Sequence, residues 1–164
     1  MEKQLQVLEY AIKMEIEGHD FYKNLASKGK NKRVQNMFAG LAEMEMEHYN
    51  LLKEQKELIA SGQAFQGVDI ASMREKDFFK ERLDSEISDM ETGLGDISVI
   101  RMAYLIENDL AEFYKKAAEN TQDPAGKKMY EDLADWEEEH RKILYEEYQS
   151  YTQENWFDMG FSPF

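Results

Sequence analysis

Apolar residues recur every three or four positions along four long stretches of this chain. That spacing is typical of amphipathic helices, and it predicts helices at about residues 3–26, 32–60, 97–120 and 124–150. Gly29 and the pair Ser61-Gly62 interrupt the pattern between these stretches. The chain contains only 2 prolines, so little in it would break long helices. We therefore predict an all-α fold.

Residues with good capping side chains precede three of the predicted helices. Asn31 and Asp96 are expected N-caps, and Asp123 is a third, with Pro124 at the first helical position. The second and third helices are separated by a long connection, 61–95, in which we expect one short extra helix at about 74–90. The connection is therefore expected to be a crossover rather than a tight turn.

Six polar residues occupy inward positions of these helices where apolar residues would be expected. In chain order they form a lone Glu, a Glu-x-x-His motif, a second lone Glu and a second Glu-x-x-His motif. These six residues, called the hexad below, are Glu15, Glu45, His48, Glu107, Glu137 and His140. An isolated charge inside a core costs several kcal/mol, so the hexad needs a compensating partner.

The two halves of the chain repeat. Each member of the hexad in the first half meets an identical residue 92 positions later, and neighbouring residues correspond too, for example Phe21-Tyr22 with Phe113-Tyr114. We predict a single domain of 1–164 that contains hairpin 1 (about 3–60), the crossover (61–95), hairpin 2 (about 96–150) and an aromatic tail (151–164). The tail is expected to pack on the bundle or on a neighbouring subunit.

The hexad has the composition of a dinuclear metal centre. Residues i and i+3 of a helix share a face, so each Glu-x-x-His motif is able to grip one ion. Two divalent cations also balance the charge of four carboxylates. Imidazole and carboxylate ligands suit iron or manganese, and the residues alone leave both metals open. Tyr22 and Tyr114 lie two turns beyond the lone glutamates, where their hydroxyls are expected to orient ligands of a facing helix.

The composition of the chain disfavours several classes of binding partner. The formal net charge of −14 disfavours nucleic acid and anionic membranes, and no apolar run approaches the ~20 residues of a membrane span. The absence of cysteine excludes thiolate metal sites. We expect a cytoplasmic protein.

Among the other inward or repeated residues, His19 is expected at the boundary of the core or behind a ligand, and Glu47 and Glu139 on the surface.

The quoted motifs resemble those of the ferritin-like superfamily, and within it the rubrerythrin-like branch. The similarity rests on Ala11-Ile12-Lys13-Met14-Glu15, on Leu41-Ala42-Glu43-Met44-Glu45 with His48, and on their copies in the second half. It implies a four-helix bundle with a di-iron centre that reacts with hydrogen peroxide or dioxygen in oxidative-stress defence.

The sequence departs from that branch in two ways. Rubrerythrins carry a rubredoxin domain with four cysteines, which this chain cannot form, so we expect electrons from a separate donor protein. Many also have an extra Glu three residues after the third-helix ligand, where this chain has Leu110. We expect a homodimer. Two other functions stay open: a ferroxidase in iron handling, and a non-catalytic bundle whose metal is structural or lost.

Overall fold

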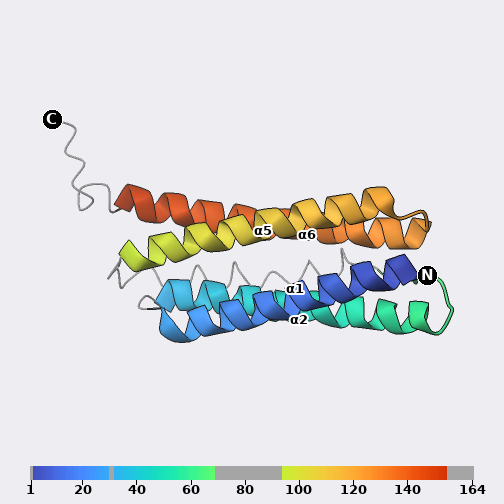
Figure 1. The fold of residues 1–164 in the computed structure, drawn as a ribbon. Helices are drawn as coiled ribbons and strands as arrows, with labels where there is room; N and C mark the ends of the chain where they lie inside the picture. Colours follow the sequence, from blue (N-terminus) through green and yellow to red (C-terminus); the bar gives the residue numbers. More distant parts are fainter. Residues whose placement is uncertain (1, 30–31, 69–93, 155–164) are drawn as a thin grey trace.

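The computed structural model describes residues 2–29, 32–68 and 94–154, and nearly all of them lie in four long helices. These are α1 (Glu2–Lys28), α2 (Lys32–Ala60), α5 (Leu94–Asn120) and α6 (Pro124–Glu154). Helix α1 packs along α2 to form hairpin 1, and α5 packs along α6 to form hairpin 2 (Figure 1). The predicted all-α four-helix bundle is confirmed.

The end of α2 and the start of α5 lie at opposite ends of the bundle (Figure 1). This placement explains why the two hairpins are joined by a long connection rather than a tight turn. The expected short helix at 74–90, the cap at Asn31 and residues 155–164 of the expected aromatic tail lie outside the described residues.

Local signals set several helix ends. The backbone N–H of Gly126 donates to Oδ1 of Asp123 at 2.9 Å, so the predicted cap of α6 is confirmed. Helix α2 ends at Ala60, and two residues later Gly62 has a φ of 82°, in the left-handed region that glycine adopts without strain. The Gln63 N–H then donates to the carbonyl of Leu58 at 3.0 Å and closes the helix end.

Two predicted boundaries were wrong. Helix α5 starts at Leu94, so Asp96 is not its cap but a residue of its first turn. An acidic residue is favourable both at the N-cap and in the first turn, because it caps a helix and also stabilises the positive end of the helix dipole. Helix α6 does not end near Ser150 but continues to Glu154, because Tyr151 extends its buried stripe with only 2% of its surface exposed.

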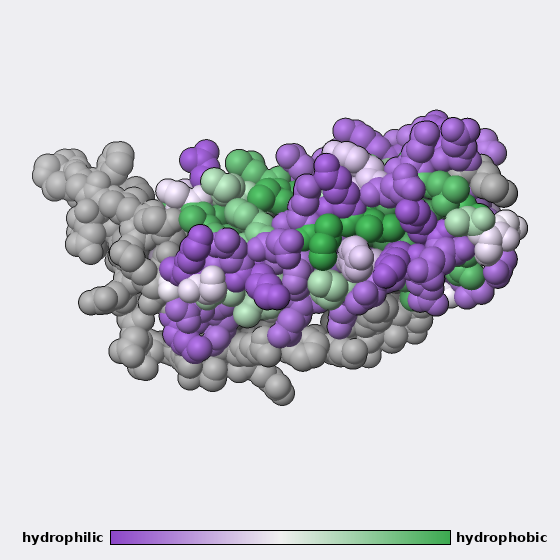
Figure 2. Space-filling model, turned by 60° about the horizontal axis from the view of Figure 1, so that its bottom comes forward, coloured by the Kyte–Doolittle hydropathy of each residue, from purple (hydrophilic) through white to green (hydrophobic). Residues whose placement is uncertain are grey.

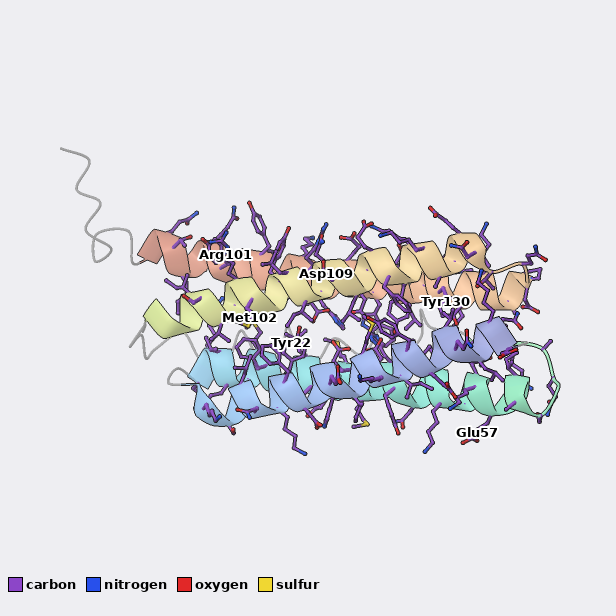
Figure 3. The ribbon with its side chains drawn as sticks, in the orientation of Figure 1. Tyr22, Glu57, Arg101, Met102, Asp109 and Tyr130 are labelled. Carbon is purple, nitrogen blue, oxygen red and sulfur yellow. The ribbon has the colours of Figure 1, made fainter. Side chains whose placement is uncertain are left out.

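The core lies between the two hairpins and consists of apolar side chains from all four helices. Its fully buried members include Leu8, Leu41, Ile100 and Leu133. Tyr22 and Tyr130 point toward this interior, whereas Glu57 points away from the bundle (Figure 3). At two equivalent positions the repeat places stacked aromatic pairs in the core. The pairs are Tyr22 with Phe38, and Tyr114 with Tyr130.

In the face shown in Figure 2, hydrophilic side chains surround a narrower hydrophobic band. One ion pair also joins the hairpins: Arg33 of α2 donates from Nε and Nη2 to a carboxylate oxygen of Glu147 on α6, at 3.0 and 2.8 Å. None of the described helices combines the length and the apolar character that a membrane crossing requires.

Candidate metal centre

The four helices bring the whole hexad to one place in the middle of the bundle. Helices α1 and α5 each contribute a lone glutamate, and α2 and α6 each contribute a glutamate and a histidine one turn apart. All six residues are fully buried, with 0% of their surface exposed. The amphipathic spacing of the helices thus directs these polar side chains inward together with the apolar residues around them.

The hexad divides into two overlapping groups whose ligand atoms lie within 4.8 Å of one another. The first group is Glu15, Glu45, His48 and Glu137, and the second is Glu45, Glu107, Glu137 and His140. Glu45 and Glu137, here called the shared glutamates, belong to both groups. Each lone glutamate and each histidine belongs to one group only. The arrangement therefore has two adjacent places for a cation, with two carboxylates between them.

The ligand atoms face one another at the spacing of a coordination shell. From Nδ1 of His48, the nearest oxygens of Glu137, Glu15 and Glu45 lie at 2.9, 3.4 and 3.6 Å. From Nδ1 of His140 the corresponding distances to Glu137, Glu45 and Glu107 are 3.1, 3.4 and 3.4 Å. Two ligands bonded at ~2.1 Å to one ion and separated by 90–110° would be roughly 3.0–3.4 Å apart.

Hydrogen bonding does not account for these contacts. Ten nitrogen and oxygen atoms of the hexad are buried without a hydrogen-bond partner, among them both oxygens of each shared glutamate and both ring nitrogens of each histidine. Buried polar atoms are nearly always paired, and an unmade pair costs about 1–3 kcal/mol. Their convergence on common points fits divalent cations held by mixed carboxylate and imidazole ligands.

The electrostatics of the protein alone point the same way. Burial raises the pKa values of Glu15 and Glu107, and the nearby Glu45 carboxylate raises them further. Burial acts in the opposite direction on His48 and His140, but the carboxylate of Glu137 outweighs it and raises both of their pKa values. The protein alone therefore retains protons here that offset the charge of the carboxylates.

The shared glutamates behave differently from the lone ones. Burial raises the pKa of Glu45, but its close contacts with Glu15 and with the two histidines outweigh burial, and the pKa is lowered. For Glu137, burial and the Glu45 carboxylate raise the pKa, while His48 and His140 lower it more strongly. These two carboxylates are therefore ionised and surrounded by protonated groups, which is the charge distribution that cations would replace.

The two predicted tyrosines lie beside the centre and cross between the hairpins. The hydroxyl of Tyr22 on α1 donates to Oε1 of Glu107 on α5, and the hydroxyl of Tyr114 on α5 donates to Oε1 of Glu15 on α1. Both phenols are fully buried. Each hydrogen bond leaves the other oxygen of its glutamate turned toward a histidine of the hexad, so the tyrosines fix the orientation of the lone glutamates.

Trp136 is a part of the centre that the sequence motifs did not identify. Its ring meets that of His48 edge-on at a centroid distance of 4.4 Å, and it is 3% exposed. It lies one residue before Glu137, and its partner in the repeat is the buried Met44. The signal in the sequence was that the second half has a bulky tryptophan where the first half has a methionine. Trp136 limits the positions that the His48 ring can adopt.

The remaining candidates lie outside the centre. His19 is half-buried, and its Nδ1 lies 2.7 Å from the carbonyl oxygen of Ala42, so it links α1 to α2. Glu139 is exposed, as expected, whereas Glu47 is half-buried. Leu110, at the place where many rubrerythrins carry an extra Glu, is buried with 2% of its surface exposed.

Fold and site together define a ferritin-like four-helix bundle with a buried carboxylate and histidine cluster able to hold metal. A family model described as Rubrerythrin matches residues 6–148. The chain therefore belongs to the rubrerythrin family, a ferritin-like family whose members typically bind two iron ions. The resemblance found in the sequence is confirmed.

Among solved structures, the chain is similar to one titled Hypothetical Protein Pfu-1136390-001 from Pyrococcus furiosus. The two chains share 28% sequence identity and superpose with a TM-score of 0.69, over 92% of this chain and 90% of that one. The comparison with curated proteins finds no match.

Proposed function

We propose that this protein is a di-iron oxidoreductase that reduces hydrogen peroxide, or alternatively dioxygen, in defence against oxidative stress. The observation that carries the proposal is the pair of overlapping ligand groups, buried in the middle of a bundle of the rubrerythrin family. Two ions held by these overlapping groups would lie close enough to act on one small oxidant molecule.

When bound, two ferrous ions would each supply one electron, so that the O–O bond of hydrogen peroxide breaks and, with two protons, two water molecules form. The protein residues bind and position the ions. The shared glutamates keep the two places together, and the lone glutamates and histidines complete each place. Because the hexad is fully buried, bulk water is kept away from the reacting centre.

The tyrosines hold the lone glutamates in a fixed orientation. Burial, followed by the charge of the carboxylate that each hydroxyl faces, raises the pKa values of Tyr22 and Tyr114 well above their usual range. Both phenols therefore keep their protons near neutral pH and stay hydrogen-bond donors. Each lone glutamate is thus held by a neutral donor while its other oxygen is free to bind.

A separate donor protein would return the electrons. The 164 residues contain no cysteine, and hence no ligands for a thiolate iron site that could relay electrons within this chain. The cytoplasm, where such donors stay reduced, is the proposed location.

Stopped-flow spectroscopy tests the proposal. Protein loaded without oxygen with two Fe(II) per chain is mixed with hydrogen peroxide, and the near-ultraviolet absorption of the ferric centre is followed. We expect oxidation within seconds and the consumption of one peroxide per two irons. Glu137→Gln should abolish the reaction, whereas the control Glu139→Gln, at an exposed repeat position of the same helix, should preserve it. If fully loaded protein stayed ferrous for minutes, the proposal would be wrong.

A further inference from the structure

A pocket of about 320 Å³ lies in the seam between α1 and α5, beside the metal centre. Six of its lining residues form three pairs related by the repeat of 92 positions. The pairs are Met14 with Ile106, Glu17 with Asp109, and Gly18 with Leu110. The pocket, called the entrance pocket below, therefore contains equivalent residues from both hairpins. Asp109, on the α5 side of the seam, is labelled in Figure 3.

The repeat is broken at one of these pairs. Methionine and isoleucine are similar in size, and glutamate and aspartate carry the same charge. Gly18, however, has no side chain, whereas its partner Leu110 is a bulky residue that is 2% exposed. The wall of the pocket is therefore thin on the α1 side and filled on the α5 side.

The thin wall lies directly over the metal centre. A methyl group added to Gly18 would lie 3.6, 3.7 and 3.8 Å from Cγ, Cδ and Oε2 of Glu45. Oε2 of Glu45 is one of the buried atoms without a hydrogen-bond partner. Gly18, which lines the pocket, thus also lies beside a carboxylate that belongs to both ligand groups.

This glycine is unfavourable for the helix that contains it. Gly18 lies in the interior of α1, where glycine is about 0.5–1 kcal/mol less favourable than alanine. An alanine methyl would meet its neighbours at ordinary van der Waals distances, so close packing does not demand a glycine. What the glycine provides is space beside Glu45.

We propose that the entrance pocket is the route by which a small, uncharged oxidant reaches the metal centre, and that Gly18 keeps this route open. The inference rests on the proposed function. Met14, Phe21, Ile106 and Leu110 make the pocket mainly apolar, which admits dioxygen and tolerates hydrogen peroxide. Glu17 and Asp109 are exposed at this seam, and their negative charges disfavour anions. A water-sized molecule takes up roughly 30 Å³, so the volume is ample.

Xenon provides a test that does not depend on catalysis, since this atom binds apolar cavities much as dioxygen does. Crystals of the metal-loaded protein are pressurised with xenon, and its anomalous signal is located. We expect a xenon atom in the entrance pocket of the natural protein and none there in Gly18→Leu, which copies the repeat partner of Gly18. Xenon bound elsewhere but not in this pocket would overturn the proposal, even if the protein reduces peroxide.

Kinetics provide the second test. Gly18→Leu should still bind two metal ions but should react with hydrogen peroxide at least tenfold more slowly, and Gly18→Ala should fall between the two. Asn24→Leu is the control, because it places the same side chain at an exposed position of the same helix. An unchanged rate in a metal-loaded Gly18→Leu would overturn the proposal.

A variant on the α5 side of the pocket provides an independent test in case Gly18→Leu does not fold. Ile106→Trp fills the pocket from α5, from a half-buried position. It should reproduce both the loss of xenon and the slow reaction, and a full rate with the pocket filled would overturn the proposal. If the natural protein itself does not react with peroxide, the proposed function fails, and the xenon experiment still tests whether the pocket is accessible.

Discussion

Replacing a lone glutamate by glutamine should remove one of the two candidate metal sites and leave the other intact. Glu107 belongs to one ligand group only, together with His140, whereas Glu45 and Glu137 belong to both. Burial raises the pKa of Glu107, so without metal this side chain is held in its neutral form. Glutamine has the same shape as that neutral form, and its carbonyl oxygen can still accept the hydroxyl of Tyr22. We therefore expect Glu107→Gln to change the stability of the metal-free protein by less than about 1 kcal/mol.

The effect on metal-dependent stability should be much larger. At a free metal concentration 100 times Kd, each bound ion stabilises the folded protein by about 2.7 kcal/mol, so two independent ions contribute about 5.4 kcal/mol. For a chain of this length, that corresponds to a rise in Tm of roughly 11–22 °C. Glu107→Gln keeps only the group that contains Glu15 and His48, so its rise should be about half as large.

Calorimetric melting with Mn(II) measures this difference, because manganese avoids oxidation during the scan. Metal analysis of the same samples should give two ions per chain for the natural protein and one for Glu107→Gln. Glu112→Gln is the matched control: it lies on the same helix and is exposed, and its ion pair with Lys115 is long at 3.7 Å. It should behave like the natural protein. If Glu107→Gln gained as much stability and metal as the control, the two-group description of the hexad would be refuted.

Three further predictions concern the proton balance, the tyrosines and the packing. The lone glutamates and both histidines have raised pKa values and hold protons without metal, so binding two ions should release about two to four protons, and affinity should fall as pH falls. Calorimetry in buffers of different ionisation enthalpy measures the release, and a value near zero would contradict the charge assignment. Tyr22→Phe leaves an oxygen of Glu107 without its donor, so metal affinity should fall 10- to 100-fold in equilibrium titrations, and an unchanged affinity would exclude the positioning role. Gly126→Ala would place a methyl group 2.5 Å from the Phe65 ring, so chemical denaturation should show a loss of about 1–3 kcal/mol, and a stabilised variant would refute this packing argument.

The sequence was sufficient to predict the helices and the inward residues, because both depend on the spacing of side chains within one helix. Helix α2 spans Lys32–Ala60, as the apolar periodicity and the Ser61-Gly62 stop predicted. The ends at Asp96 and Ser150 were misplaced. At Asp96 one residue type serves two positions equally well, and near Ser150 the outcome depended on whether Tyr151 finds a place in the core.

Features that depend on the relative rotation of two helices could not be predicted from spacing. The motif Glu45-x-x-His48 shows that two side chains share a face, but not that Glu45 also joins the group of Glu107 and His140. The same limit applies to Gly18. In the sequence it is a glycine on a helix, and its meaning depends on the distance to Glu45 on the neighbouring helix and on the gap beside α5.

The arrangement of the hexad would couple metal binding to the joining of the two hairpins. Each ligand group takes three residues from its own hairpin and one shared glutamate from the other, Glu137 for hairpin 1 and Glu45 for hairpin 2. The tyrosines cross in the same way, since each binds the lone glutamate of the opposite hairpin. A single hairpin thus has neither a complete group nor the phenol that orients its lone glutamate. In the docked pair without cations, the two ionised shared glutamates are offset only by protons retained on the other members of the hexad, and burying all these polar groups in a dry interior opposes docking. Bound cations would turn this unfavourable contribution to docking into a favourable one. The hexad, which would otherwise destabilise the bundle, would then hold the two hairpins together.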